Sequence, residues 1–453
     1  MPDSVACAPA RVQRFPGLRQ KSVAREREGG KVGAHVQDYS LMAWLRSNVR
    51  RRLAQGWFWL AHVGFPFHWG GYGETPEARR RRRFGRWAIR QQWPVWLRPF
   101  AVAGMVLLWP IGAALQTRAL LHGRTAPGGQ LEDAPGRFDW ALWQAAVRNN
   151  ASAAEAYKFG LTAKDAEPGT WIYDLETTRS LARLAAPEAI ELAHDKAAFA
   201  DFCARIGLVH APTLGHWKAG QSVGPEQTTS DWPDSVVLKP TRLNNAAGLE
   251  VWHRQDGTYS KGSENLNPAQ LRLRAAALSA HFGEMLAQPC LTLHPSLTAR
   301  GLTGVPVARL LTGLWPDGQV TVLDAYFSAV REGQFASNAG YGPKWPLDPQ
   351  NGVLQPSDAR VLPRWTKASI VGMELPDWER ATTLAVQGHR SFPAHVPILG
   401  WDIAFTDQGP VALETNTGVS CSVPQDTRQT PSGSGCFGQL LDAWIVAHQR
   451  RAR

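Results

Sequence analysis

The stretch at residues 400–418, GWDIAFTDQGPVALETNTG, constrains the fold more than any other part of the sequence. Two apolar runs flank a turn at residues 406–410, which is the pattern of two antiparallel strands joined as a hairpin. Asp402 lies inside the first run, and Glu414 and Asn416 close the second. Burying a carboxylate is strongly unfavourable unless it gains a charged or hydrogen-bonding partner. The pattern therefore predicts a strand pair whose carboxylates are paired with a positively charged group.

Strand geometry predicts that these three polar side chains share one face of the hairpin. Asp402 and Glu414 lie on opposite arms, and Asn416 follows Glu414 by two residues, so it points the same way. Two carboxylates and an amide oxygen are hard ligands suited to Mg²⁺ that also holds nucleotide phosphates. The alternative is an exposed hairpin with acids by chance. Its apolar neighbours disfavour that alternative: Ile403, Ala404, Phe405, Val411, Ala412 and Leu413.

A lysine ends another buried strand, VVLKP at 236–240. Lys239 placed there offers a point charge that can meet a phosphate. The alternative is an ordinary strand-end lysine whose ammonium group reaches solvent.

The remaining pattern mixes helices with antiparallel hairpins, which predicts an α+β fold. Helical spacing begins at HDK, residues 194–196, and Gly207 ends that helix before a short strand containing Pro212. The segment 422–435 is predicted to be mobile, either closing over the site or forming a simple loop. The other expected elements are an alanine-rich helical region over 137–193 with a stop at Gly160, a strand at 234–240 with a hairpin partner at 247–252, a helix over 268–285, a short connection at 288–291, a hairpin over 307–332 and a helix near 376–391.

The chain as a whole is similar to a known superfamily in the order of its motifs. HDK at 194–196, VVLKP at 236–240, AQP at 287–289 and Asp402 with Glu414-x-Asn416 have the order and rough spacing of the ATP-grasp superfamily. LGWDIAFTDQGPVALETN most resembles the sugar-transfer-associated branch. The resemblance covers about 190–445 and implies two α+β subdomains that grip ATP, preceded by a basic, aromatic-rich, mostly helical N-terminal region.

The resemblance also implies roles for individual residues. Lys239 and Lys196 resemble lysines that contact nucleotide phosphates, and Gln288, Pro289, Cys290 and Leu291 resemble the hinge that meets adenine. Asp402, Glu414 and Asn416 resemble the Mg²⁺ ligands, with Mn²⁺ as an alternative metal. Arg309 and Arg331 are candidates for the phosphate or acyl-phosphate, with a plain surface charge as the alternative for each. Asn338 resembles the asparagine of an N-x-x-G loop near the γ-phosphate.

The sequence departs from the family pattern at two places. The loop after the KP strand reads TRLNNAAG at 241–248 and keeps only Gly248, where the family often has several glycines. Ala336 stands where related ligases commonly have an arginine, two residues before Asn338. These departures leave an inactive relative of the ligases as an alternative.

The expected function is that of an ATP-dependent carboxylate–amine ligase that forms a C–N bond through an acyl-phosphate. Its expected substrates are small-molecule or sugar-linked carboxylates and amines, within cell-envelope or polysaccharide biosynthesis. Positioning and electrostatics would supply the catalysis, so no cysteine or serine nucleophile is required. The alternative is a nucleotide-binding, membrane-associated module without ligase turnover.

The basic charge of the chain is concentrated at its N-terminal end. Of the net +11, residues 1–100 carry 19 Lys and Arg against 6 Asp and Glu, a surplus of 13, so residues 101–453 sum to −2. Basic clusters such as the arginine run at 78–86 suit nucleic acid or anionic lipid. The aromatic stretch at 53–71 favours lipid, and nucleic acid is disfavoured because no recognition motif accompanies the run.

The uncharged segment 99–115 has three interpretations: a buried helix, a monotopic or re-entrant membrane contact, or a true span. Seventeen residues are at the lower limit for a span, and Pro110 interrupts them. A single span is disfavoured, because ATP use by the C-terminal part and the arginines before 99 both favour the cytosolic side. The expected location is cytoplasmic, with peripheral association at the inner face of the cell membrane as an option. Five scattered cysteines without a CxxC pattern agree with a reducing compartment.

These patterns divide the chain into five parts. Residues 1–41 are expected to be a disordered basic tail, with Met42 as an alternative start, and TAPGGQLEDAPG at 125–136 reads as a linker. The parts that follow the tail are the basic and aromatic region at 42–125, a helical pre-domain at 137–193, a first ATP-grasp subdomain at 194–290 and a second at 291–446.

Overall fold

The computed structural model describes residues 76–121, 138–174, 176–177, 184–224, 232–243, 247–330, 335, 343–359, 370–393 and 395–451. The chain divides into two units, Met1–Leu60 and Ala61–Arg453, and every described residue belongs to the second. The expectations for 1–41, 42–75 and the linker at 125–136, and those for Arg331 and Asn338, lie outside the described residues.

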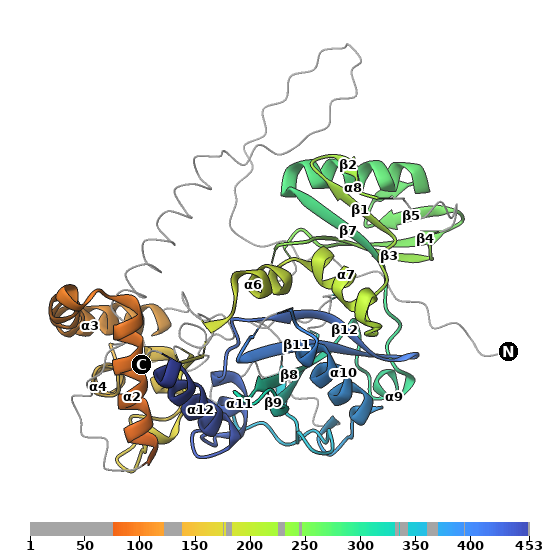
Figure 1. The fold of residues 1–453 in the computed structure, drawn as a ribbon. Helices are drawn as coiled ribbons and strands as arrows, with labels where there is room; N and C mark the ends of the chain where they lie inside the picture. The colour runs from red at the N-terminus through yellow and green to blue at the C-terminus, as the bar shows by residue number, and fades with distance from the viewer. Residues whose placement is uncertain are drawn as a thin grey trace, which may run out of the picture. The chain divides into compact units, whose positions relative to one another are not determined.

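A seven-stranded antiparallel sheet forms the first half of the α+β core, in the order β2-β1-β7-β3-β4-β5-β6 (Figure 1). Its strands are β1 (Gly215–Lys218), β2 (Gln221–Ser222), β3 (Ser235–Pro240), β4 (Glu250–Gln255), β5 (Thr258–Lys261), β6 (Glu264–Leu266) and β7 (Glu284–Pro289). Helix α8 (Pro268–Phe282) contributes Leu271 and Ala275 to a core with Trp217 and Trp252. Leu238 belongs to that core, so strand alternation turns its neighbour Lys239 to the opposite face.

A five-stranded antiparallel sheet forms the second half, in the order β10-β9-β8-β11-β12. Its strands are β8 (Val307–Leu314), β9 (Val320–Ser328), β10 (Lys344–Pro346), β11 (Ile398–Thr406) and β12 (Gly409–Asn416). One face buries Trp401 and Leu310 against helices α7 (Lys196–Ile206) and α10 (Trp378–Arg390). The other face buries Leu311 and Ile398 with helix α12 (Cys436–Arg451).

The helices that precede the sheets pack among themselves and against the end of the chain. They are α2 (Pro76–Gln92), the 3₁₀ turn η1 (Val95–Leu97), α3 (Arg98–Leu121), α4 (Trp140–Asn149), α5 (Ala153–Lys158), the 3₁₀ turn η2 (Pro168–Thr170) and α6 (Pro187–His194). Helices α3, α4 and α5 share a core that includes Trp109 and Leu142. Helix α2 packs against α12 through Trp87 and Ile445.

Most of the expected elements are present, including the hairpins at 307–332 and 400–418 and the helix that Gly207 ends. Gly207 caps α7 with φ of +68°, a conformation that favours glycine. The antiparallel partner of β3 is β4, as expected, although β4 begins at Glu250.

Four expectations about individual segments were wrong. The helix expected to reach 285 ends at Phe282, and residues 284–289, which include part of the expected connection, form the interior strand β7. Around Pro212 there is only an isolated bridge at His210, and the strand starts at Gly215. Pro410 lies in β12 rather than in the turn. The segment 422–435 is not a loose loop throughout, because residues 422–428 form helix α11 (Ser422–Arg428), which is mostly buried.

Candidate functional site

A row of four polar side chains crosses the five-stranded sheet. Asp402 on β11 lies directly opposite Glu414 on β12 and, on its other side, opposite Arg309 on β8. Arg309 in turn lies opposite Tyr326 on β9. Directly opposite residues of antiparallel strands point to the same face, so all four share one face. The expectation that the two carboxylates share a face is confirmed, and Asn416, two residues beyond Glu414, lies on it as well.

Arg309 binds Asp402 through two nitrogens of its guanidinium group. Nη2 donates to Oδ2 at 2.6 Å, and Nε donates to Oδ1. Gly400 makes room for this arginine, because a Cβ there would lie 3.3 Å from Arg309 Cδ. Burial by itself would lower the pKa of Arg309, but the charge of Asp402 raises it above the ordinary value. Arg309 is therefore a permanent cation that holds Asp402 in place.

Two lysines from other elements face the Glu414 end of the row. Lys196, the first residue of α7, places Nζ 3.4 Å from Glu414 Oε2 and donates to Leu243 O at 2.8 Å. The Lys196 backbone N–H also bonds Thr241 O just after β3, which ties α7 to the lysine strand. Lys239 on β3 is close enough for the charges of Glu414 and Lys196 to shift its pKa. The structure thus brings together five of the predicted site residues: Lys196, Lys239, Arg309, Asp402 and Glu414.

The ionisation of the row follows from burial and charge together. Burial lowers the pKa of Lys239 to about 8, and Glu414 opposes that shift. Burial raises the pKa of Asp402 to about 6. The charge of Glu414 also raises this pKa, and the charge of Arg309 lowers it. For Glu414, burial would raise the pKa, but Lys196, Arg309 and Lys239 together lower it. Glu414 is therefore the firmly ionised carboxylate of the pair.

The donor set fits a hard divalent cation such as Mg²⁺. Asn416 Nδ2 is buried and has no hydrogen-bond partner among the described residues, so one end of this amide is free to serve a ligand. Amide oxygen and nitrogen exchange places by a half-turn, which can direct Oδ1 into that position. The described segments contain no cluster of three or more His, Cys, Asp or Glu suited to a metal. A cation here would therefore rest on two carboxylates, one amide and oxygens from its substrate.

Two polar groups of the predicted adenine hinge already form hydrogen bonds within the protein. The Gln288 side chain is buried and donates from Nε2 to Ala211 O at 2.9 Å. Cys290 N–H donates to Ser235 O at 2.8 Å, so that amide is committed to the strand pair. Among the described residues, Leu291 N–H makes no backbone hydrogen bond. The adenine role of Gln288, Pro289, Cys290 and Leu291 stays a prediction.

Sequence reasoning missed Tyr326 and a cluster around Asp174. The alternation of β9 carries a usable signal for Tyr326, since it stands opposite Arg309 once the 307–332 hairpin is drawn in register. The Asp174 carboxylate accepts from Ser420 Oγ at 3.0 Å, from Ser422 N at 2.9 Å and from Ser422 Oγ at 2.9 Å. No local pattern links Asp174 with residues nearly 250 positions later.

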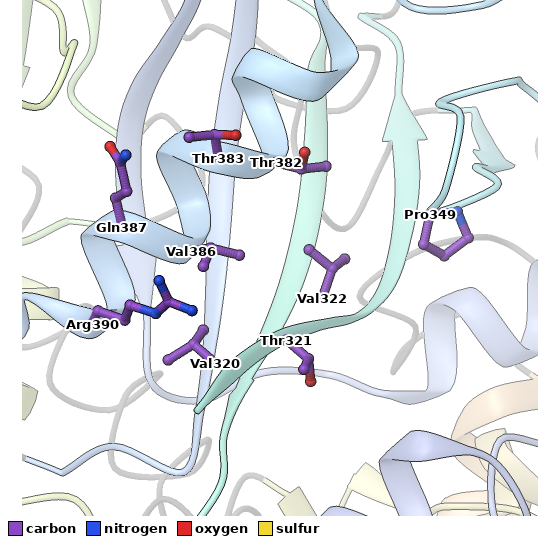
Figure 2. Close-up of a pocket in the computed structure, with 9 residues that line it drawn as sticks. All are labelled: Val320, Thr321, Val322, Pro349, Thr382, Thr383, Val386, Gln387 and Arg390. Atoms are coloured by element: carbon purple, nitrogen blue, oxygen red, sulfur yellow. The ribbon is translucent and has the colours of Figure 1, made fainter. Parts of the chain in front are cut away.

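An open pocket lies elsewhere on the same sheet, between β9 and α10 (Figure 2). Helix α10 packs with Gly388 on Trp401, whose side chain points away from the face of Asp402. The pocket carries one charged side chain, Arg390, and no carboxylate. Its lining residues are Val320, Thr321, Val322, Pro349, Thr382, Thr383, Val386, Gln387 and Arg390. The chemistry of the row is therefore not shared by this pocket.

Comparison with known proteins gives one family and several distant structures. A family model described as sugar-transfer associated ATP-grasp matches residues 177–440. No curated protein matches the chain.

The solved structures that resemble the chain have low sequence identity. D-alanyl-alanine synthetase A from Vibrio cholerae is 12% identical, covers 58% of this chain and 67% of its own, and has a TM-score of 0.36. D-alanine–D-alanine ligase from Bacillus anthracis is 11% identical over 62% of this chain and 78% of its own, with a TM-score of 0.35. Biotin carboxylase from Campylobacter jejuni is 12% identical over 58% of this chain and 48% of its own, with a TM-score of 0.34.

Proposed function

The chain belongs to the sugar-transfer associated ATP-grasp family, and from that premise we propose that it is an ATP-dependent ligase that joins a carboxylate to an amine. One observation carries the proposal beyond membership of the family. The row Arg309, Asp402 and Glu414 on one sheet faces two lysines, Lys196 and Lys239, from outside that sheet. Cations and carboxylates in this arrangement can hold a magnesium–triphosphate group from both sides.

The lysines and Arg309 supply positive potential for phosphates. The ammonium group of Lys239 is close enough to Glu414 to be affected by its charge and makes no hydrogen bond with a described residue, so it can bind an incoming phosphate oxygen. Lys196 is anchored at Leu243 O and Glu414, which fixes its Nζ near the same place. Fixed cations of this kind stabilise the charge that develops as a phosphoryl group transfers.

The carboxylates and the amide would hold the metal. Asp402, Glu414 and Asn416 are the residues that would bind Mg²⁺, with Mn²⁺ as an alternative. A bound Mg²⁺ neutralises charge on the β- and γ-phosphates during transfer. The bidentate bond from Arg309 uses one lone pair on each oxygen of Asp402, so the carboxylate keeps lone pairs for a cation. The substrate carboxylate would attack the γ-phosphate, and an amine would then displace phosphate from the acyl-phosphate to form the C–N bond.

Turnover with defined pools of substrate tests the proposal directly. Purified protein with Mg²⁺ and ATP is expected to release ADP and phosphate only when both a carboxylate and an amine are supplied. Lys239→Ala is expected to lower this turnover by about a hundredfold or more, as loss of a charge at a transferring phosphoryl group commonly does. Lys218→Ala, an exposed lysine on β1, is the matched control and is expected to keep full turnover.

The opposite results identify the competing function. Magnesium-dependent ATP binding without turnover on any pool would indicate the nucleotide-binding module rather than a ligase. An Asp402→Asn, Glu414→Gln double variant that keeps the wild-type metal-dependent thermal shift would remove the metal assignment.

The substrate class is a second, finer part of the proposal. We infer a sugar-linked or cell-envelope carboxylate from the family description, which associates the fold with sugar transfer. Mass spectrometry of envelope polymer from cells with and without the protein tests it. An amide-linked substituent that disappears with the protein supports the assignment, and identical polymers from both cells contradict it.

A further inference from the structure

One face of helix α3 is apolar and open to solvent. Phe100, Leu107, Ile111 and Leu115 are spaced so that they follow one side of the helix, and each is at least 60% exposed. The 3₁₀ turn η1 precedes α3 and adds Val95 and Trp96, which are 72% and 70% exposed. Most of the large apolar side chains exposed among the described residues lie on η1 and α3, and we call their exposed surface the α3 face.

The opposite side of α3 already has its packing partners. Trp109, Ala113 and Leu120 are buried against α4 and α5. Trp143 Nε1 donates to Pro110 O at 2.9 Å, and Ala153 N–H donates to Gln116 Oε1 at 3.1 Å. A helix that is apolar all round is normally buried all round, in a core or in lipid. One side of α3 is buried inside the protein, whereas the α3 face has no packing partner among the described residues.

The sequence that contains α2 and α3 is strongly basic, although Asp442 of α12 pairs with Arg80 and Arg83. Between Glu77 and Glu132 the sequence contains no acidic residue and ten arginines, namely Arg79 to Arg83, Arg86, Arg90, Arg98, Arg118 and Arg124. Arg98 bridges the end of α2 to the start of α3 by donating to Trp93 O at 3.0 Å and to Arg90 O at 3.2 Å. Exposed Arg86 and Arg90 therefore lie on the helix that leads into the apolar face, and exposed Arg118 lies near its other end.

We propose that the α3 face binds the surface of an anionic membrane, with α3 lying in the interfacial plane. An apolar stripe that begins with an exposed tryptophan and is flanked in the sequence by arginines matches both layers of such a surface, the acyl boundary and the anionic headgroups. A protein partner would have to cover about the same apolar area and present acids to the arginines, whereas an anionic bilayer supplies both continuously. The proposal stands independently of the ligase chemistry.

The geometry favours lying on the membrane over crossing it. Among the described residues no single helix is long and apolar enough to cross a membrane, although the pair Val95–Gly104 and Val106–Leu121, bent by 44°, passes by length and composition. The bend is expected from Pro110, which cannot donate a hydrogen bond to the carbonyl of Val106. The buried half of α3 is moreover committed to α4 and α5.

Vesicle co-sedimentation of the full-length protein tests the proposal. Wild type is expected to pellet with phosphatidylglycerol–phosphatidylcholine vesicles more than with pure phosphatidylcholine, and increasing salt should weaken the difference. A Phe100→Ser, Leu107→Ser, Ile111→Ser variant is expected to lose about tenfold or more in partitioning to either vesicle, because its apolar contact is gone. An Arg86→Gln, Arg90→Gln, Arg118→Gln variant is expected to lose only the preference for anionic vesicles.

A matched control separates the α3 face from apolar exposure in general. Val209→Ser, Leu273→Ser removes two side chains that are 50% and 68% exposed elsewhere, and it is expected to pellet like wild type. Circular dichroism checks that each variant is folded. Wild type that stays in the supernatant with every vesicle overturns the proposal, as does a serine triple variant that pellets like wild type. A wild-type dimer that the triple variant converts to monomer without any vesicle binding assigns the face to a second copy of the chain instead.

Discussion

At the scale of single residues, Arg309 and Asp402 depend on each other. Both side chains are nearly buried, at 14% and 11% exposure. Arg309→Ala is expected to lower the free energy of unfolding by about 3–5 kcal/mol, because it leaves a buried carboxylate without its cation. Adding Asp402→Asn to that variant should recover part of the loss, which urea denaturation of the four proteins in the cycle would measure.

The exposed pair Asp377 and Arg380 is the control for that cycle. Its side chains are 41% and 60% exposed and lie 3.0 Å apart. Solvent screens such a pair, so Arg380→Ala is expected to change stability by about 1 kcal/mol or less. Strictly additive effects of Arg309→Ala and Asp402→Asn would contradict the interdependence.

His389 is expected to make stability depend on pH. Its Nε2 donates to Val396 O at 2.8 Å, and its Nδ1 lies 2.8 Å from Thr312 Oγ1. Burial lowers its pKa from 6.5 to about 4, and no charged group contributes to that shift. The unfolded chain therefore binds the proton more readily, and stability is lost as pH falls from about 6.5 toward about 4.

The full loss from this histidine amounts to about 3 kcal/mol. Urea midpoints of wild type and His389→Gln at pH values from about 7 to about 4 measure it, since both proteins share every other titrating group. The stability advantage of wild type over the variant should shrink across that range. An advantage that stays constant with pH would mean that His389 does not titrate in this window.

The site residues that could be predicted from the sequence are those whose position depends on local alternation. Asp402, Glu414 and Asn416 share a face because they lie on one hairpin with a short turn. The complete row also requires β8 to lie beside β11, and the sequence of neither strand predicts which strand will be its neighbour. The Asp174 cluster was missed for the same reason, since its partners Ser420 and Ser422 come from the other end of the chain.

At the scale of elements, the errors come from segments whose composition contradicts their environment. Strand β7, EMLAQP, holds a glutamate, a glutamine and a proline, and these residues favour a helix end or a loop. It is nevertheless the strand between β1 and β3, because both neighbours pair with it. Helix α11 lies within the segment 422–435, for which the sequence predicts a mobile loop, yet its Gln425 is completely buried. Tertiary partners override local propensity in both segments.

Helix α10 is held close to β11 by a glycine. A Cβ on Gly388 would overlap the Trp401 indole, and Trp401 immediately precedes Asp402 on β11. Gly388→Ala is expected to destabilise the protein by about 1–3 kcal/mol despite the better helix propensity of alanine. Thermal unfolding should show the lowered midpoint, with reduced metal-dependent stabilisation if β11 shifts.

Gly104 in α3 provides the matched comparison for Gly388. A Cβ on Gly104 meets nothing within 4 Å. Gly104→Ala is therefore expected to be neutral or stabilising by up to about 1 kcal/mol. Equal changes in stability from the two substitutions would indicate that the Trp401 side chain moves aside without strain.

At the scale of the whole molecule, the part of the chain that precedes the family match belongs to the same fold. Ile172 is buried in one core with Leu311 and Val419. Gln425 accepts from Ile172 N–H at 3.0 Å and donates to Ile172 O at 2.7 Å, so a buried amide fastens the two ends. The family match begins at 177, which leaves Ile172 outside. The matched residues are therefore not a complete structural unit.

This leads to a prediction for the fragment of residues 177–453. It lacks Ile172, one of the hydrogen-bond partners of Gln425, and exposes the core that Ile172 fills, so it is expected to lose about 5 kcal/mol or more, comparable to the stability of a whole domain. Full-length Gln425→Leu removes the two hydrogen bonds to Ile172 together with those to Cys421 O and Ser432 N–H, and should lose about 2–4 kcal/mol. Gln439→Leu at an exposed position of α12 should change little. Urea unfolding of all four proteins measures the set. A fragment with the full-length midpoint would show that the ATP-grasp core folds without its N-terminal neighbour, and a neutral Gln425→Leu would show that the amide is not what joins them.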